Sequence, residues 1–435
     1  MFAKIACRPS RSLRIPQQVK EFHRDRARVI ALLVLVSTLI VALDRFVFHL
    51  VPRDFLTYRY AGQQAAAGHD IYQGDISGLD LTGQPFTYPP FAALVFRGLG
   101  FLNWQFSYFL WTVASLTGLG LVVYWLLSPL AHRRLEWSAG ALVVASCTSV
   151  GFTNVADGQV NIALMTLCLL DLHLLRFCVD RNGTGRWIQN LSGVGVGLAA
   201  AIKITPALFI VHLAVSRQWR TLAVSLMSGG SATLAAYVFF PQLSTTFFSA
   251  VLWNLQDRVR MDHPLSFWGN ASVTGALHAG GDWTTPVIPL VLLMIVAGAL
   301  AGAAFAHRRG HPLNAILIIG LVAPIISPYA WVHHYIYLVP AGTIILRPLL
   351  LHPPHPDLSN RLRRAGAVWC LLALGPGSGH WLLQHGGEWL LPLALIIREG
   401  PILASLLCIT LLVRDAQTRS PVATPTTTSF IGRFS

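Results

Sequence analysis

The stretch from Val51 to Phe96 reads VPRDFLTYRYAGQQAAAGHDIYQGDISGLDLTGQPFTYPPFAALVF. It is polar, and it lies between two apolar segments that are each long enough to cross a bilayer. Its acidic residues are Asp54, Asp70, Asp75 and Asp80. Because polar loops held at the ends of membrane spans are where binding and catalytic residues concentrate, we predict a functional first outer loop over residues 51–104.

The composition indicates an integral membrane protein. Of the 435 residues, 54% are hydrophobic and 11% are charged, whereas soluble domains average roughly 25% charged residues. The net charge of +14 comes from short basic clusters between apolar runs, which is the pattern of the positive-inside rule and not of a nucleic-acid-binding surface. The six cysteines are scattered without CxxC or Cys/His spacing, so they predict small hydrophobic side chains and no zinc site.

The amino-terminal segment predicts the orientation. Residues 1–28 contain eight Lys or Arg residues and precede the apolar run Val29–Leu50, which as a helix would be about 33 Å long. The long basic region and the lack of a small-residue cleavage site predict an uncleaved first span with a cytoplasmic amino terminus. The loop that carries Asp54 would then emerge on the extracytoplasmic face.

Nine further apolar runs predict spans whose connections alternate between basic cytoplasmic ones and weakly charged outer ones. They lie near residues 106–127, 138–155, 160–177, 222–240, 286–306, 313–327, 334–346, 364–383 and 389–413. The run Leu191–Val215 is broken by Lys203 and Pro206 and has basic flanks, which predicts two half-length helices that return to the cytoplasm. We therefore expect an all-α polytopic bundle of about 10–12 transmembrane helices over residues 29–415 and a disordered cytoplasmic tail at 416–435.

Asp54 is the candidate catalytic residue. A carboxylate just outside a membrane span can accept a proton from a sugar hydroxyl, as general-base catalysis requires. The same side chain could instead pair with Arg53 or Arg59, or cap a short helix, and the chemistry of the residue alone leaves these interpretations open.

Three basic side chains are candidates for holding a phosphate. Lys203 lies in an apolar run, where a lysine costs about 2.5–3.5 kcal/mol, so it needs a lipid phosphate, an internal carboxylate or helix-terminal carbonyls as a partner. His333 and His334 in SPYAWVHHY begin a span at the outer face, and we expect one of them to face the site because adjacent helical residues point about 100° apart. A metal would need a third ligand, and no DxD or HExxH motif occurs, so we expect no metal.

Aromatic and amide side chains in three outer segments are candidates for sugar contacts. Tyr88 in PFTYPP could stack on a sugar or anchor in the lipid headgroups. Gln159 and Asn161 in DGQVN could bind sugar hydroxyls or join two helices by hydrogen bonds. Asn270 and Ser272 in GNASVTGAL could line an acceptor groove or cap the helix that follows.

Six segments occur in an order typical of one known family. They are DFLTY with Asp54 and Tyr58, then QPFTYPPFAALVF, DGQVNIALM, AIKITPAL, GNASVTGAL and SPYAWVHHYIYLVP. In these segments the chain resembles the GT-C glycosyltransferases of family 87, in particular the polyprenol-phosphate-mannose-dependent α-1,2-mannosyltransferases of the actinobacterial envelope. It departs from the family's frequent Asp-Leu-x-Val-Tyr at residues 54–58 and from Asn-Gln-Ser at residues 270–272, which keeps the base and puts the acceptor in question.

The resemblance implies an inverting transfer of mannose from polyprenyl-phosphate-mannose to a cell-envelope mannoside glycolipid, of the phosphatidylinositol mannoside or lipomannan type. Asp54 would be the general base that forms an α-1,2 linkage. Lys203 with His333 or His334 would hold the donor phosphate, and Tyr58 would lie in the sugar site. The implied setting is the plasma membrane, with an extracytoplasmic active site, membrane lipids as surroundings, no metal and no nucleic acid.

Two other functions remain open at this point. One is an arabinofuranosyltransferase that uses polyprenyl-phosphate-arabinose, which belongs to the same superfamily. The other is a polyprenyl-lipid transporter without chemistry. A transporter would explain Lys203 in an apolar run, but it gives no reason for Asp54 in a loop joined to the Tyr-Pro segment.

Overall fold

The computed structural model describes residues 17–72, 84–128, 134–172, 189–259, 263–347 and 358–418, and every regular element in these ranges is a helix. The first half contains α1 (Gln17–Leu43), the π-helix η1 (Asp44–Phe48), α2 (Arg53–Ala66), α3 (Pro90–Phe96), η2 (Arg97–Gly100), α4 (Trp104–Leu126), α5 (Arg134–Cys147), α6 (Ser149–Ala156), α7 (Asn161–Leu172), α9 (Val194–Ile202) and α10 (Ala207–Val215). The second half contains α11 (Trp219–Phe239), α12 (Pro241–Ser249), η5 (Val251–Asn254), α13 (Leu255–Val259), α14 (Val273–Ala279), η6 (Asp282–Val287), α15 (Ile288–Arg308), α16 (Pro312–Ile325), η7 (Val332–Tyr335), α17 (Leu338–Leu346), α18 (Leu358–His385), η9 (Glu388–Leu390), α19 (Leu391–Arg398) and α20 (Gly400–Thr418). The prediction of an all-α protein is confirmed.

Several of these helices are suited to a bilayer by length and composition, so the chain is a multi-pass membrane protein. Among the described residues, five qualify on their own, and the bent pair α5 and α6 would make a sixth. The five are Ala27–Val47, Trp104–Leu126, Trp219–Phe239, Trp283–Arg308 and Gly400–Thr418. Shorter apolar helices occupy other predicted spans, at Asn161–Leu172, Pro312–Ile325 and Val332–Leu346.

Two predicted spans are interrupted in the structure. The run 138–155 is two helices that meet at 80°, because α5 ends at Cys147 and Thr148 caps the amino terminus of α6 through its hydroxyl. The run 389–413 is also two helices, α19 and α20, which separate at Glu399. Pro401 follows directly and lacks the N–H that a continuous helix would need. Each of these two predicted spans is therefore two helices and not one continuous helix.

The predicted break at Lys203 is confirmed. α9 ends at Ile202, Lys203 has an extended backbone (φ −143°, ψ 139°), and α10 starts after Pro206. The other end of α9 is held by Asp171 of α7, whose carboxylate accepts hydrogen bonds from the backbone nitrogens of Gly193 (2.8 Å) and Val196 (2.9 Å). Since a carboxylate at a helix amino terminus is favourable, this contact fixes α9 against α7 and positions the break.

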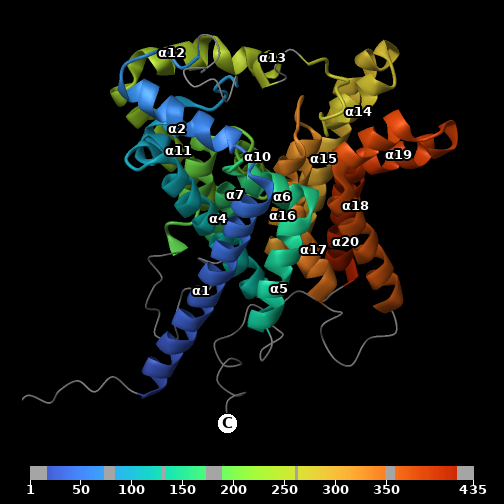
Figure 1. The fold of residues 1–435 in the computed structure, drawn as a ribbon, viewed down its shortest axis with the longest axis horizontal. Helices are drawn as coiled ribbons and strands as arrows, with labels where there is room; N and C mark the ends of the chain where they lie inside the picture. The colour runs from blue at the N-terminus through green and yellow to red at the C-terminus, as the bar shows by residue number, and fades with distance from the viewer. Residues whose placement is uncertain are drawn as a thin grey trace, which may run out of the picture.

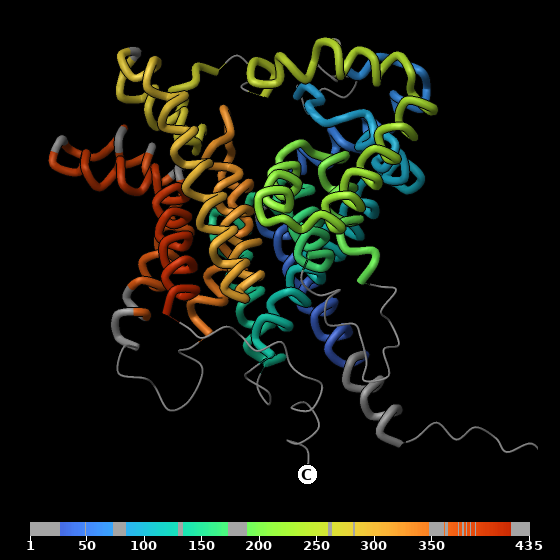
Figure 2. The backbone as a smooth tube through the Cα atoms, turned by 180° about the vertical axis from the view of Figure 1, so that it is seen from behind, coloured from blue at the N-terminus to red at the C-terminus, as the bar shows by residue number. Residues whose placement is uncertain are grey.

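The predicted first outer loop is largely helical in its described part. α2 packs on α3 and η2. Gly62 of α2 approaches the backbone of Arg97 so closely that a β-carbon there would lie 2.4 Å from its nitrogen. The rings of Tyr58 and Phe96 stack with their centroids 4.6 Å apart. In Figures 1 and 2, α2 lies with α12 and α13 at one end of the bundle, so this segment forms a helical cap there. The predicted acids Asp75 and Asp80 lie outside the described residues.

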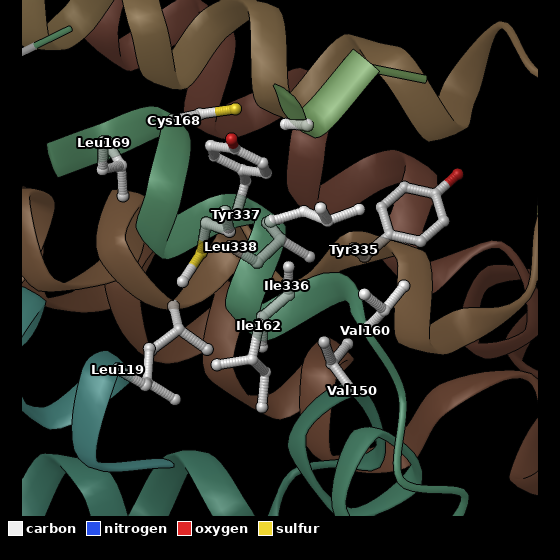
Figure 3. Close-up of a cluster of buried hydrophobic side chains, with 14 of the residues drawn as sticks. Leu119, Val150, Val160, Ile162, Cys168, Leu169, Tyr335, Ile336, Tyr337 and Leu338 are labelled. Carbon is white, nitrogen blue, oxygen red and sulfur yellow. The ribbon is translucent and has the colours of Figure 1, made fainter. Parts of the chain in front are cut away.

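The hydrophobic core runs through the bundle and includes buried residues of α2 and α12 in the cap. Figure 3 shows Leu119 of α4, Val150 of α6 and Ile162 of α7 gathered with the segment Tyr335–Leu338. Cys168 and Cys408 are buried free thiols, as predicted for small hydrophobic side chains, whereas Cys147 and Cys370 are exposed. Because α6, α7 and η7 meet in this core, their ends are held at fixed positions for the polar site described next.

Candidate active site

Asp54 lies in the first turn of α2, directly after Pro52 and Arg53. Its Oδ2 atom accepts a short hydrogen bond from Nε2 of Gln159, 105 positions away in the chain. The backbone nitrogen of the next residue, Phe55, donates a 3.0 Å bond to the carbonyl oxygen of Asp157. The amino terminus of α2 is therefore tied at two points to the turn between α6 and α7.

Gln159 is the centre of a hydrogen-bond network made of sequence-predicted residues. Its Oε1 atom accepts from the hydroxyl of Tyr58 at 3.0 Å and from Nδ2 of Asn161 at 3.2 Å. The Tyr58 hydroxyl also lies 2.8 Å from the hydroxyl of Tyr88. Because a side-chain amide has a fixed donor and a fixed acceptor end, this arrangement orients the Gln159 NH₂ group toward Asp54.

Lys203 completes the network at the break between α9 and α10. Its Nζ atom donates to Oδ1 of Asn161 at 2.8 Å and to the hydroxyl of Tyr88 at 3.5 Å, and it lies 5.2 Å from the centroid of the Tyr88 ring. Within the described residues, Lys203 forms no ion pair with a carboxylate. Its positive charge is therefore available to an anion, as the phosphate hypothesis requires.

The two histidines face different surroundings. The carbonyl oxygen of His333 accepts from the amides of Asn154 (2.8 Å) and Asn161 (3.3 Å), and its Nδ1 lies 3.9 Å from Oδ2 of Asp157. His334 turns back, so that its Nδ1 accepts from the backbone nitrogen of Trp331 at 3.2 Å. Only the first ring therefore points toward the carboxylates, as expected for adjacent residues.

Asn270 and Ser272 are placed as supports. The side chain of Asn270 donates to the carbonyls of Leu265 (3.0 Å) and Pro328 (3.3 Å) and accepts from the nitrogen of Ala330 (3.0 Å). The hydroxyl of Ser272 accepts from the nitrogen of Gly275 at 3.0 Å and caps α14. The structure shows the capping alternative for Ser272, and it places both residues outside the hydrogen-bond network of Asp54.

Two polar residues of this site were not among the predicted site residues. Asp157 follows α6 within the DGQVN segment, and Asn154 is a polar residue one helical turn earlier in an apolar run. Gly158 between Asp157 and Gln159 has φ +66°, and a β-carbon there would lie 2.6 Å from Cβ of Phe55. The glycine between two polar residues was the sequence signal that could have revealed Asp157, because glycine favours a tight turn and polar residues in such a turn can lie close together.

The two carboxylates are partly buried. Burial raises the pKa of Asp54 to about 6, although the hydrogen bond from Gln159 and the charges of Lys203 and Arg53 act in the opposite direction. Burial also raises the pKa of Asp157, and the nearby charge of Asp54 raises it further. A carboxylate with its pKa near neutrality is suited to taking up a proton during a reaction.

Three side chains in this site could together ligate a metal ion. One oxygen each from Asp54 and Asp157 and one nitrogen of His333 lie within 4.8 Å of one another. The third ligand, which the sequence motifs did not reveal, is Asp157.

Asn161 and His334 also line a pocket. The rest of its lining is mostly apolar, from Leu164, Met165, Pro206, Phe209, Pro324, Ile336 and Tyr337. A few polar groups among mostly apolar walls suit an amphipathic ligand with a polar head.

Comparison with known proteins agrees with the sequence motifs. Residues 86–328 match the family model of glycosyltransferase family 87. The polyprenol-phosphate-mannose-dependent alpha-(1-2)-phosphatidylinositol mannoside mannosyltransferase of Mycobacterium tuberculosis is 27% identical over 311 residues, which are 67% of this chain and 69% of that protein. The corresponding phosphatidylinositol pentamannoside mannosyltransferase of Mycolicibacterium smegmatis is 30% identical over 310 residues, or 69% of this chain and 68% of that protein. The crystal structure of ArnT from Cupriavidus metallidurans bound to undecaprenyl phosphate aligns with 90% of this chain and 77% of its own, with 14% identity and a TM-score of 0.39.

Proposed function

This chain belongs to glycosyltransferase family 87, and from that membership we propose that it transfers mannose from polyprenyl-phosphate-mannose to a phosphatidylinositol mannoside or related envelope glycolipid. The product linkage is α-1,2. The curated relatives are named for this donor and for phosphatidylinositol mannoside acceptors, and the six sequence segments follow the same family order. The transfer takes place at the extracytoplasmic face of the plasma membrane, because the positive-inside pattern of the sequence predicts that Asp54 lies on that side.

The observation that carries the proposal is the hydrogen-bonded path from Asp54 to Lys203. It runs from Asp54 through Gln159 and Asn161 to the ammonium group, in three consecutive contacts. A base and a cation held by two rigid amides suit a reaction in which one substrate loses a proton and the other releases a phosphate.

Asp54 serves as the general base. It accepts the proton of the acceptor hydroxyl while the hydroxyl oxygen attacks the anomeric carbon from the face opposite the phosphate. The bond between that carbon and the phosphate oxygen breaks, and the lipid phosphate leaves with the electron pair. Inversion of a β-linked donor gives the α linkage. Because the leaving phosphate is a weak base, no protein group has to protonate it.

Lys203 and the pocket hold the donor. The ammonium group stabilises the negative charge that develops on the phosphate as the bond breaks. This electrostatic stabilisation is strongest where water is excluded. The mostly apolar pocket that Asn161 and His334 line takes the first isoprene units of the lipid, since its walls are mostly hydrocarbon. Tyr88, which contacts Lys203, would face the sugar of the donor with its ring and hydroxyl. Tyr58 is buried and supports Tyr88 through a hydroxyl contact of 2.8 Å.

The test is a transfer assay with defined substrates. The full-length enzyme in lipid nanodiscs is given polyprenyl-phosphate-mannose or polyprenyl-phosphate-arabinose with a phosphatidylinositol mannoside, and the glycolipid product is identified by mass. We expect mannose transfer in the wild type and a decrease of about 10²–10⁴-fold in Asp54→Asn.

Asp70→Asn is the matched control, because Asp70 is an exposed carboxylate of the same segment that accepts a bond from its neighbouring Tyr72 nitrogen. Full activity of Asp54→Asn would exclude Asp54 as the base. If the enzyme transferred only arabinose, its donor would be polyprenyl-phosphate-arabinose and not polyprenyl-phosphate-mannose. Movement of polyprenyl lipid across the bilayer without any product would favour the transporter.

A further inference from the structure

We propose that Asp54, Asp157 and His333 form a binding site for one divalent cation of the Mn²⁺ class. The inference rests on the proposed function, because it adds a cation to the same site. It departs from the sequence expectation of no metal, which was based on missing motifs. The three ligands come from three segments that no local motif can join: α2, the turn after α6, and η7.

The donor atoms are close enough to share one ion. All three lie within 4.8 Å of one another, and Nδ1 of His333 is 3.9 Å from Oδ2 of Asp157. A cation about 2.0–2.2 Å from each donor requires donor separations of about 3–4 Å, which small side-chain rotations supply. Two carboxylate oxygens with one imidazole nitrogen are a mixed donor set that favours first-row transition metals over Ca²⁺.

Hydrogen bonds hold the carboxylate of Asp54 and the backbones of Asp157 and His333 in place. Nε2 of Gln159 donates to Asp54, and the backbone nitrogen of Phe55 donates to the carbonyl of Asp157 at 3.0 Å. The amides of Asn154 and Asn161 hold the carbonyl of His333. Metal sites need such outer contacts, because they keep the ligands oriented before the ion arrives.

The ring of His333 provides an independent indication. The residue is 7% exposed, and within the described residues its two ring nitrogens make no hydrogen bond. The carboxylate of Asp157 likewise accepts no hydrogen bond from the described part of the chain, although it is two-thirds buried. An imidazole nitrogen that has no hydrogen-bond partner among the described residues and faces two carboxylates across a short gap points to a ligand between them.

The charge balance agrees with a cation. Among the described residues, neither Asp54 nor Asp157 forms an ion pair with a lysine or arginine. Lys203 and Arg53 act on Asp54 from beyond contact distance, and the ammonium group of Lys203 is directed to Asn161 and Tyr88. Two carboxylates that face each other in a partly buried site repel, and a divalent cation between them removes that repulsion.

A cation at this position would assist the proposed transfer. Three protein ligands would leave coordination positions open, and the ion would lower the pKa of an acceptor hydroxyl bound there. Asp54 would still take up the proton of that hydroxyl. The hydroxyl oxygen then forms the new bond to the anomeric carbon, and the lipid phosphate leaves with the electron pair.

Binding is tested without substrate. The full-length enzyme in nanodiscs is stripped with EDTA, the chelator is removed, and Mn²⁺ is titrated while free Mn²⁺ is followed by electron paramagnetic resonance. We expect one bound Mn²⁺ in the wild type and in the control Asp70→Asn. Asp157→Asn and His333→Gln should each weaken Mn²⁺ binding by at least about tenfold. Asparagine keeps the size of the side chain and the carbonyl that binds Phe55, and size-exclusion elution identifies the variants that are folded.

The outcomes separate this site from the proposed function. No Mn²⁺ bound by the wild type at about 1 mM, or unchanged binding in either folded variant, would overturn the cation site. Mannose transfer by the stripped enzyme in that case would leave the proposed function standing. Mn²⁺ binding with the expected losses, but no transfer from any polyprenyl-phosphate sugar, would support the site and refute the function.

Discussion

The Nζ atom of Lys203 lies 2.8 Å from Oδ1 of Asn161, and this hydrogen bond joins the two halves of the site. Asn161 begins α7, and Lys203 occupies the break between α9 and α10. The same Asn161 donates to Gln159, which in turn holds Asp54. The cation and the base are thus connected through two neutral amides, and within the described residues they form no direct ion pair that would neutralise both.

Replacement of Lys203 by alanine should lower the rate of mannose transfer more than it lowers the stability of the fold. Removing one donor that stabilises a developing negative charge costs about 10²–10³-fold in kcat, so we expect a decrease of that order in mannose transfer. Rates are measured over a range of donor concentrations in nanodiscs. Arg220→Ala is the control, because Arg220 is an exposed cation that contacts Asn190 at the start of α11. Unchanged kcat and unchanged apparent donor affinity in Lys203→Ala would remove its phosphate role.

Gly158→Ala should destabilise the site through its backbone. The residue has φ +66°, and the new β-carbon would lie 2.6 Å from Cβ of Phe55, so α2 would have to shift away from the turn that holds Gln159. We expect a loss of at least about 1 kcal/mol, measured as a lower thermal midpoint in detergent, together with lower activity. Gly68→Ala separates backbone strain from the steric clash. Gly68 also has a positive φ (+82°), but nothing lies within 4 Å of the new β-carbon. Equal losses in both variants would contradict the steric explanation.

Asn270→Ala tests whether this residue supports the fold or contacts the acceptor. Its three hydrogen bonds join residues 265, 328 and 330, and it is 1% exposed, so we expect destabilisation by about 1–3 kcal/mol. The thermal midpoint and the KM for the acceptor are measured on the same preparation. Asn254→Ala is the control, because that exposed amide makes one bond to Ala250. A raised acceptor KM at unchanged stability would favour the acceptor-groove prediction over the structural role.

Transfer should decrease in acid. Burial raises the pKa of Asp54 to about 6, so the carboxylate takes up a proton as the pH falls through that value and can no longer accept one. We expect kcat/KM to fall about tenfold per pH unit below it. The folded-state pKa lies above the unfolded one, so this group stabilises the fold at low pH and loses that contribution as the pH rises. Activity that is lost below pH 6 is therefore not lost through unfolding driven by Asp54.

The pH profile also reports on the proposed cation. Protons and a metal ion compete for the same carboxylates, so an excess of Mn²⁺ should move the acid limb to lower pH. The measurement is kcat/KM from pH 5 to pH 8 at two Mn²⁺ concentrations, with the thermal midpoint followed in parallel. An acid limb that stays fixed at saturating Mn²⁺ would contradict a cation bound to Asp54. A profile that stays flat to pH 5 would contradict Asp54 as the base.

Local chemistry in the sequence was sufficient to predict the class of the protein and to select several residues that meet in the structure. Apolar runs and basic clusters predict a helical membrane protein, because the cost of burying charge in lipid acts on each segment separately. The break at Lys203 and Pro206 was also predictable, since a proline lacks the N–H that a helix interior needs and a lysine is costly in an apolar helix. Asp54, Gln159, Asn161 and Lys203 were recognised through their segments, and the structure brings all four into one network.

Only the tertiary structure decided which of these side chains meet. Asp54 and Gln159 are 105 positions apart, and the contact between them depends on how α2 packs on the turn after α6. The approach of Asp157 and His333 to Asp54 depends on the same packing, so no spacing in the sequence could reveal a third ligand. Likewise, the sequence left open whether Asn270 contacts a sugar or supports the fold. Its hydrogen-bond partners at residues 328 and 330 lie in a distant loop, so only the structure shows them. Segment composition is a local property, whereas the partners of a polar side chain are set by helices that converge from far apart in the chain.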